Sequence, residues 1–260
     1  MRNEPQLIQP VLQEACTVYQ AQVKDGEAWN YLTQTRGISQ EMIERFRLGF
    51  APNSRTFLTA QLTQTFSLDT LVSAGLTGIP SSNDEDLSRE PYDRLRNVIT
   101  FPVFDIGGKI VSFKGRKIDE VESSYGKYIS CYPWRTPPRE RALYGINFAR
   151  EEIQKAGEIF LFEGAVDTIL AHQNGLQNSV SLLGTGLTAE DIVFLYQKFG
   201  MIKVNVCYDY DVPGIKAAQK VKQMFDGSER IKAYVVKGQK TDPADIFTQG
   251  KSLKGNLIEI

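Results

Sequence analysis

The first half of the chain shows two different spacings of hydrophobic positions. Apolar residues recur every three to four positions along residues 8–50, with a break at Arg36-Gly37 and a new start at the N-cap Ser39. Shorter helical stretches are expected at 55–65 and 68–74, and a loop at 80–92. Alternating residues 98–104 and 109–114 flank a turn-forming run, residues 105–108, which is typical of a β-hairpin. Residues 127–130 are expected to add a further short strand.

The pattern changes from residue 157 onward, where apolar runs of strand length alternate with helical stretches. Strands are predicted at 158–162, 178–183, 202–208 and 231–236, and helices at 165–174, 188–199 and 213–225. Each connection is long enough to cross a sheet face, which favours a parallel α/β sheet. We therefore expect a mixed α+β subdomain over 1–156, with helices in 8–75 and a β part in 92–145, then a Rossmann-like α/β domain over 157–250 and a short tail over 251–260.

Composition narrows the class of protein. The chain has 260 residues, 42% hydrophobic and 23% charged, enough for one large core or two modest ones. No apolar run approaches the ~20 residues of a membrane span, and the first residues lack the pattern of a secretory signal. A cytoplasmic protein that does not enter membranes is expected. Three scattered cysteines and one histidine argue against a disulfide framework and against a zinc site.

Charge is distributed unevenly: residues 1–93 carry −5, residues 94–150 carry +6 and residues 151–260 carry −2. Aromatic residues are interleaved with the cations of the basic middle segment, which suits single-stranded nucleic acid because cations hold phosphates while exposed rings stack on bases. The alternative is that these cations only solvate strand faces, and that Phe113 and Tyr128 are buried in the β part. The candidate nucleic-acid residues of this segment are Lys114, Arg116, Lys127, Arg139 and Arg141.

Carboxylates follow the first and third strands of the predicted α/β sheet: Glu163 comes after one, and Asp209 and Asp211 after the other. The carboxyl ends of parallel strands meet at one sheet edge, so we expect these groups to be neighbours. Hard oxygen ligands gathered there favour Mg²⁺ or Mn²⁺ and phosphate chemistry. The alternative is that Glu163 and Asp167 only favour a helix N-terminus electrostatically, and that Asp209 and Asp211 cap the helix after Pro213.

Two further features belong to the same edge. The turn Gly184-Thr185 follows the second strand and would let backbone N–H groups approach a phosphate. Asp242 follows the fourth strand and could add a ligand for a second metal ion, although Asp-Pro is also an ordinary helix start.

The pattern Glu163-Gly164-x-x-Asp167, then Gly184-Thr185, then Asp209-x-Asp211-x-x-Gly214 resembles the TOPRIM domain of bacterial primases, topoisomerases and some nucleases. Upstream landmarks resemble the DnaG-type DNA primase core, in the same order. They are Tyr31-Leu32 with Arg36-Gly37-Ile38-Ser39, Phe46-Arg47-Leu48-Gly49-Phe50-Ala51-Pro52, Tyr92-Asp93-Arg94-Leu95-Arg96, Phe101-Pro102, Gly115-Arg116, Lys127-Tyr128 and Leu143-Tyr144-Gly145.

This resemblance implies an enzyme that synthesises short RNA primers on single-stranded DNA from ribonucleoside triphosphates, with Mg²⁺ or Mn²⁺. It implies a cytoplasmic, nucleoid-associated role in replication, with a replicative helicase or a separate zinc-binding or helicase-binding subunit as further partners. The implied metal-site residues are Glu163, Asp209 and Asp211, with Asp167 and Asp242 in support. The implied nucleic-acid or nucleotide residues are Arg94, Arg96, Lys114, Arg116, Lys127, Arg139, Gly184 and Thr185.

The chain departs from the family pattern in two ways. It is expected to lack the zinc-binding and helicase-binding domains, and Ala244 stands where the family often has the second aspartate of Asp-Pro-Asp. A metal-dependent nuclease and a non-catalytic DNA-binding module therefore remain open as alternatives. A topoisomerase is disfavoured, because the chain has no room for a gate domain carrying a nucleophilic tyrosine.

Overall fold

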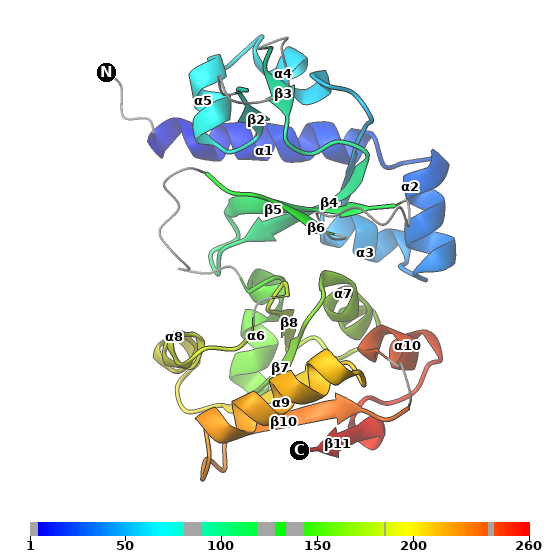
Figure 1. Cartoon of the computed structure of the whole chain (residues 1–260), viewed down its shortest axis with the longest axis vertical. Helices are drawn as coiled ribbons and strands as arrows, with labels where there is room; N and C mark the ends of the chain where they lie inside the picture. The colour runs from blue at the N-terminus through cyan, green and yellow to red at the C-terminus, as the bar shows by residue number, and fades with distance from the viewer. Residues whose placement is uncertain (1–4, 81–89, 119–127, 134–142, 185, 239–241) are drawn as a thin grey trace. The chain divides into compact units, whose positions relative to one another are not determined.

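The chain forms two compact units (Figure 1). The first comprises Met1–Thr35 and Ser39–Ala142, and the second Arg36–Ile38 and Leu143–Ile260. The computed structural model describes residues 5–80, 90–118, 128–133, 143–184, 186–238 and 242–260. No helix in these ranges is long and apolar enough to cross a membrane.

An antiparallel sheet of strand order β1-β4-β5-β6 forms the centre of the first unit. Its strands are β1 (Gly49–Ala51), β4 (Val98–Phe104), β5 (Ile110–Lys117) and β6 (Tyr128–Cys131). The predicted hairpin between β4 and β5 is confirmed, and Lys109 N donates a 2.9 Å hydrogen bond to the Asp105 carboxylate in its turn. The sequence pattern ended this strand at residue 114, but β5 extends to Lys117. Arg116 therefore lies on the strand.

Helices of this unit cover the sheet or flank it. They are α1 (Pro5–Ala21), α2 (Gly26–Asn30), the π-helical stretch η1 (Tyr31–Thr35), α3 (Gln40–Arg45), α4 (Phe57–Leu62) and α5 (Leu68–Ser73). The predicted N-cap Ser39 is confirmed, because its hydroxyl accepts a hydrogen bond from Met42 N at the start of α3.

The core of the first unit forms where α1 packs against β1 and β5 (Figure 1). The rings of Tyr19 and Phe113 meet edge to face with centroids 5.7 Å apart, so the predicted burial of Phe113 is confirmed. A Cβ at Gly49 would lie 2.6 Å from the Tyr19 carbonyl carbon. Glycine at this position therefore allows the close approach of helix and strand.

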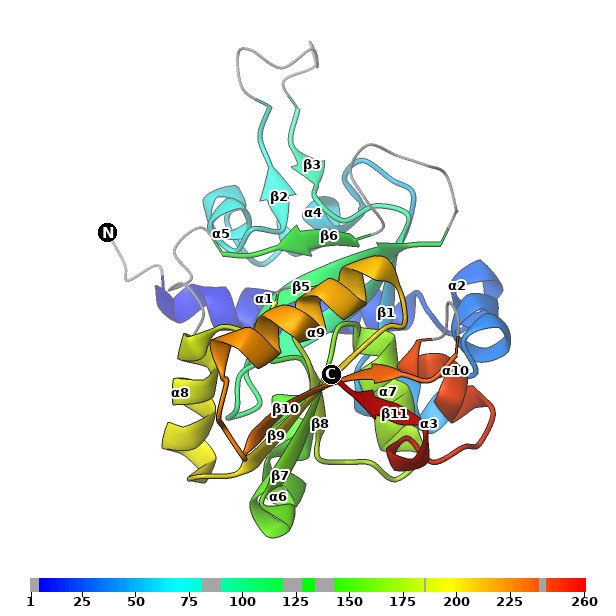
Figure 2. The same ribbon diagram turned by 60° about the horizontal axis from the view of Figure 1, so that its bottom comes forward.

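A separate two-stranded ribbon, β2 (Thr77–Gly78) with β3 (Tyr92–Asp93), packs beside α4 and α5 (Figure 2). The buried Asp93 carboxylate accepts hydrogen bonds from Leu58 N at 2.7 Å and Thr59 N at 2.9 Å, which satisfies the first turn of α4.

The sheet of the second unit has the strand order β11-β10-β9-β7-β8, and all neighbours but β11 are parallel. Its strands are β7 (Glu158–Phe162), β8 (Ser179–Ser181), β9 (Lys203–Tyr208), β10 (Ile231–Val236) and β11 (Leu257–Glu259). The parallel α/β prediction is confirmed. Residues 257–259, assigned to the tail by sequence, pair with β10 as an antiparallel edge strand.

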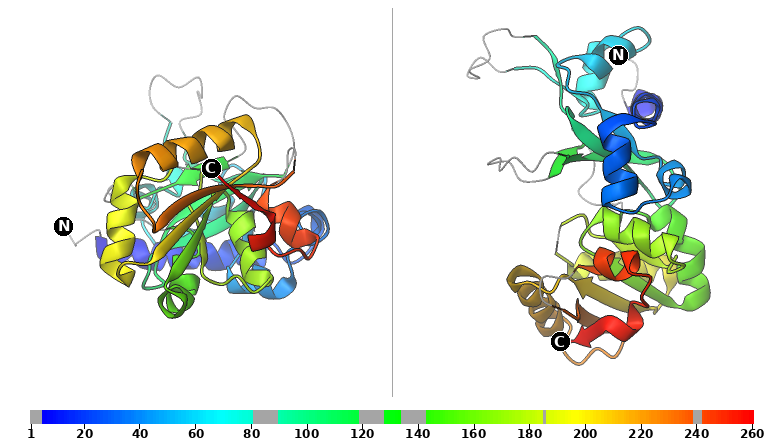
Figure 3. Two further views of the ribbon diagram at one scale, coloured as in Figure 1. Left: turned by 90° about the horizontal axis from the view of Figure 1, so that it is seen from below. Right: turned by 90° about the vertical axis from the view of Figure 1, so that its right-hand side faces the viewer.

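The helices of this unit lie on both faces of the sheet. They are α6 (Ile146–Ala156), α7 (Ala165–Gln173), α8 (Ala189–Phe199), α9 (Val212–Met224), α10 (Pro243–Thr248) and the 3₁₀ turn η2 (Lys254–Asn256). α9 covers β9 and β10 on one face, while α7 and α10 pack together on the other (Figure 3). The predicted helices at 165–174, 188–199 and 213–225 are confirmed as α7, α8 and α9, and Asp242 is the N-cap of the short helix α10.

Candidate metal and phosphate site

The carboxyl ends of β7 and β9 bring Glu163 and Asp209 together. The two strands are parallel neighbours, paired from Glu158↔Lys203 to Leu161↔Val206, so the residues that follow them leave the sheet side by side. The Asp209 backbone N–H points to Glu163 Oε1 at 3.5 Å, and both residues are half-buried. Two carboxylates 46 positions apart in sequence thus form the centre of an acidic cluster.

Asp211 joins this cluster from the start of α9. It is the exposed N-cap of that helix, and its Oδ1 accepts a 2.7 Å hydrogen bond from Gly214 N. A Cβ at Gly214 would lie 2.3 Å from the Asp209 carbonyl oxygen. The absence of a side chain at Gly214 therefore lets α9 begin directly against the Asp209 loop.

Asp167 has a different environment, because backbone groups occupy both of its carboxylate oxygens. Oδ2 accepts from Gly164 N at 3.1 Å, and Oδ1 accepts from Ala244 N at 3.1 Å. The residue is buried and ties the start of α7 to the start of α10. Asp242, the N-cap of α10, accepts from Asp245 N at 2.8 Å.

These carboxylates disfavour one another's charge. The pKa of Asp209 is raised from 3.8 to about 7. The largest cause is burial, and the rest is the negative charge of nearby carboxylates, those of Glu163, Asp242, Asp211 and Asp245. Burial also raises the pKa of Glu163, with Asp211 adding to the effect, and it raises the pKa of Asp167 well above its usual range, with Asp242 and Asp209 contributing. A cation at the cluster would reverse this electrostatic cost.

The loop after β8 wraps around the backbone of Glu163. The Glu163 carbonyl accepts 2.9 Å hydrogen bonds from Ser181 Oγ and Gly184 N, and Ser181 Oγ in turn accepts one from Leu183 N. Gly184 therefore lies beside the cluster, but its N–H is bonded within the protein. The sequence analysis did not select Ser181, although a serine at the end of a buried strand is a usable signal for a residue that holds the backbone of a neighbouring strand. Thr185 lies outside the described residues.

The basic candidates belong to the first unit. Lys114 and Arg116 are two positions apart on β5 and so point to the same face of the sheet. Arg94 and Arg96 are exposed next to β3, and the Arg96 guanidinium lies 5.6 Å from the Tyr92 ring centroid. Lys127, Arg139 and Arg141 fall outside the described residues.

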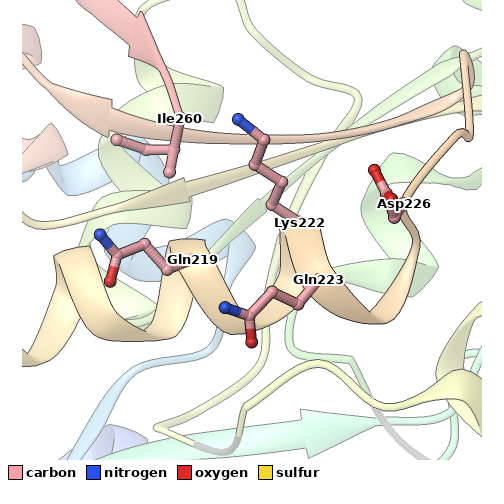
Figure 4. Close-up of a pocket in the computed structure, with 5 residues that line it drawn as sticks. All are labelled: Gln219, Lys222, Gln223, Asp226 and Ile260. Atoms are coloured by element: carbon pink, nitrogen blue, oxygen red, sulfur yellow. The ribbon is translucent and has the colours of Figure 1, made fainter.

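A surface pocket at the far end of α9 contains none of these candidates. It is lined by Gln219, Lys222, Gln223, Asp226 and Ile260 (Figure 4). Lys222 is eleven residues beyond Asp211, about 16 Å along a helix axis. The acidic cluster and this pocket are separate features of the second unit.

Comparison with known proteins decides the family. Residues 18–150 match the family model of the DNA primase catalytic core, N-terminal domain, and residues 160–247 match the Toprim-like family. The chain belongs to the DNA primase catalytic core family. A DNA primase of Listeria monocytogenes is 33% identical over 215 residues, which are 83% of this chain and 33% of that protein. The chain thus spans about a third of the length of such curated relatives.

Solved primase structures share the fold. The RNA polymerase domain of Mycobacterium tuberculosis primase DnaG matches with a TM-score of 0.83 at 21% identity, over 97% of this chain and 84% of that one. A DnaG primase catalytic domain bound to single-stranded DNA matches with a TM-score of 0.77 at 25% identity, over 96% of this chain and 79% of that one. The predicted primase-core fold is confirmed.

Membership of the primase family implies use of a divalent metal ion, and the donor chemistry of the acidic cluster suits one. In the described ranges, no three His, Cys, Asp or Glu side chains are drawn together tightly enough to hold a metal ion. The fit rests on Asp209, whose Oδ1 is buried with no hydrogen-bond partner among the described residues, and on the raised pKa values around it. The donors are all hard carboxylate oxygens, which suit a divalent cation that binds phosphates.

Proposed function

We propose that this chain is the catalytic core of a DNA primase, which joins ribonucleotides into short RNA primers on a single-stranded DNA template. The observation that carries the proposal is the meeting of Glu163 and Asp209 at the carboxyl ends of β7 and β9, inside a Toprim-like unit. The primase-specific half of the chain favours primer synthesis over the nuclease alternative.

In this proposal, Glu163, Asp209 and Asp211 hold Mg²⁺ or Mn²⁺, and Asp242 contributes to a second ion. The metal, when bound, lowers the pKa of the attacking hydroxyl and neutralises charge on the phosphate. Asp167 supports the cluster by holding α7 and α10 together through its two backbone contacts. Ser181 and Gly184 fix the Glu163 backbone so that its carboxylate keeps its place.

The cationic residues would hold the phosphates of the template and of the incoming nucleotide. The nucleic-acid set comprises Arg94, Arg96, Lys114 and Arg116, together with Lys127, Arg139 and Thr185 outside the described residues. A related catalytic domain was solved bound to single-stranded DNA, which supports this choice of template. Ribonucleoside triphosphates, a replicative helicase and a separate zinc-binding subunit complete the proposed set of partners, at the nucleoid in the cytoplasm.

The proposal is tested by incubating the chain with single-stranded DNA, labelled ribonucleotides and either Mg²⁺ or Mn²⁺, and separating the products on a denaturing gel. Wild type should form short RNA oligomers, whereas Asp209→Asn should lower the yield by roughly 10²-fold or more, because removing one charge weakens the cation site. Asp226→Asn, an exposed residue at the end of α9, is the matched control and should match wild type.

Two outcomes would contradict primer synthesis. Template degradation without incorporation would identify a nuclease. DNA binding without any turnover, even with a primase zinc-binding module and helicase supplied in trans, would identify a non-catalytic module.

A further inference from the structure

Two tyrosines from separate segments of the first unit contact the Arg116 side chain. The guanidinium carbon lies 5.7 Å from the ring centroid of Tyr31 and 5.3 Å from that of Tyr128. Arg116 Nη1 also donates a 2.6 Å hydrogen bond to the Tyr128 hydroxyl. Such contacts between a cation and aromatic rings stabilise one placement of a side chain that otherwise has many rotamers.

The backbone sets the position of each tyrosine independently. Tyr128 lies directly opposite Arg116 in the pairing of β5 with β6, so the sheet register places it there. Tyr31 begins the π-helical stretch η1, and π-helical turns are rare and frequently occur at functional sites. Tyr128 was expected to be buried, but it is half-buried, and its ring and hydroxyl contact Arg116.

The guanidinium keeps most of its hydrogen-bonding capacity. Of the five N–H donors that an arginine has, one is used by Tyr128 in the described part of the chain, and no carboxylate there pairs with Arg116. Arg116 is half-buried and permanently charged, and the rings hold it without neutralising it. A planar cation with free donors is well suited to a phosphate group.

We propose that Tyr31 and Tyr128 are positioning residues that hold the Arg116 guanidinium as a receptor for one phosphate group. This inference rests on the proposed primase function, because that function supplies the phosphate. The phosphate belongs either to the DNA strand or to the ribonucleoside triphosphate. Lys114, two residues away on the same face of β5, adds positive potential without the fork geometry.

The test measures binding of a fluorescein-labelled single-stranded oligodeoxynucleotide by anisotropy, and the KM and kcat for ATP in primer synthesis. Tyr31→Leu should weaken one of the two affinities roughly three- to tenfold, which is about 0.7–1.4 kcal/mol, with kcat little changed, because the cation–π contact is lost. Tyr31→Phe keeps the ring and should restore wild-type values. Tyr128→Phe keeps the ring but loses the hydroxyl acceptor and should weaken the same affinity roughly two- to fivefold.

A double-mutant cycle separates positioning from a general structural role. In an Arg116→Ala background, Tyr31→Leu should cause no further loss, because there is no guanidinium left to position. Tyr196→Leu, a half-buried tyrosine of α8, is the matched control and should match wild type in both assays. A loss confined to the oligodeoxynucleotide assigns the phosphate to the DNA strand, and a loss confined to the KM for ATP assigns it to the triphosphate.

The proposal is overturned if Tyr31→Leu has the same effect with and without Arg116, if Tyr31→Phe is as defective as Tyr31→Leu, or if neither affinity changes. Thermal unfolding of every variant confirms that it is folded. If wild type makes primers while Tyr31→Leu matches it, the positioning role fails and the primase proposal stands. If wild type neither binds the oligodeoxynucleotide nor incorporates ATP, both proposals fail.

Discussion

Asp209 is a half-buried carboxylate of the acidic cluster whose charge the fold makes costly. Its carboxylate is partly buried, lies beside Glu163, and has its Oδ1 without a hydrogen-bond partner among the described residues. Protonation or a bound cation can each relieve this cost. The residue is therefore suited to bind a cation near neutral pH and to release protons as it does so.

This environment predicts how the stability of the metal-free protein depends on pH. The pKa of Asp209 is about 7 in the folded state, against about 3.9 in an unfolded chain. Because the folded value is raised, Asp209 contributes stability in full below about pH 4, and that contribution is lost as the pH rises to about 7. Solvent exposure reduces the expected change to about 1–2 kcal/mol.

The measurement is urea unfolding in EDTA across this pH range. Wild type should lose stability between about pH 4 and pH 7, and Asp209→Asn should show a flatter profile over the same interval. Mg²⁺ added in excess over EDTA should restore the stability of the wild-type protein at about pH 7. An equal slope in Asp209→Asn would show that another group carries the effect.

At the scale of elements, the start of α9 determines how closely the carboxylates gather. The helix begins at Val212 with Asp211 as its N-cap, and Gly214 in its first turn contacts the Asp209 backbone directly. An exposed N-cap such as Asp211 would not by itself require a glycine at position 214. The close contact between helix and loop explains why the spacing Asp209-x-Asp211-x-x-Gly214 suits this site.

We therefore predict that Gly214→Ala is destabilising and impairs catalysis. The added Cβ would meet the Asp209 carbonyl oxygen at 2.3 Å, so the helix start or the loop must shift. The expected cost is roughly 1–3 kcal/mol in urea unfolding, with a lower incorporation rate because Asp209 and Asp211 move apart. Gly255→Ala is the matched control, because a Cβ at Gly255 would meet nothing within 4 Å. Normal rate and stability in Gly214→Ala would contradict the close contact.

At the scale of the whole molecule, each unit carries a different part of the proposed chemistry. The acidic cluster lies entirely in the second unit, at the ends of β7 and β9, whereas Lys114 and Arg116 lie on β5 of the first. Residues 36–38 lie between two segments of the first unit in sequence but belong to the second unit. Gly37 O accepts a 2.9 Å hydrogen bond from Gln173 Nε2 of α7, which joins this segment to the second unit.

This division predicts that template binding and catalysis can be separated. EDTA or Asp209→Asn should abolish ribonucleotide incorporation, while the affinity for a labelled single-stranded oligonucleotide should change by no more than about twofold, because the phosphates are held by cations. If the phosphate held by Arg116 belongs to the DNA strand, Arg116→Ala should weaken DNA binding and make it less dependent on salt. The two properties are measured by gel assay and by anisotropy at several salt concentrations. Loss of DNA binding in EDTA would instead show that the metal site holds the template.

The sequence alone determined the features that depend on neighbouring residues. Periodicity predicted β7, β9 and α9, and local signals predicted the N-cap Ser39 and the β4–β5 hairpin, because each is set by side chains a few positions apart. The parallel order of the strands even indicated that Glu163 and Asp209 would meet, since the carboxyl ends of neighbouring strands share one edge.

The partner that each of several polar groups finds depends on the packing of segments far apart in the sequence. Asp167 looked like a supporting metal ligand, but its oxygens accept from Gly164 N and from Ala244 N, which is 77 residues away. Tyr31 reaches Arg116, and β11 pairs with β10, without any local signal. Such contacts arise from long-range packing, in which buried polar groups and strand edges must be satisfied by whatever the fold brings near.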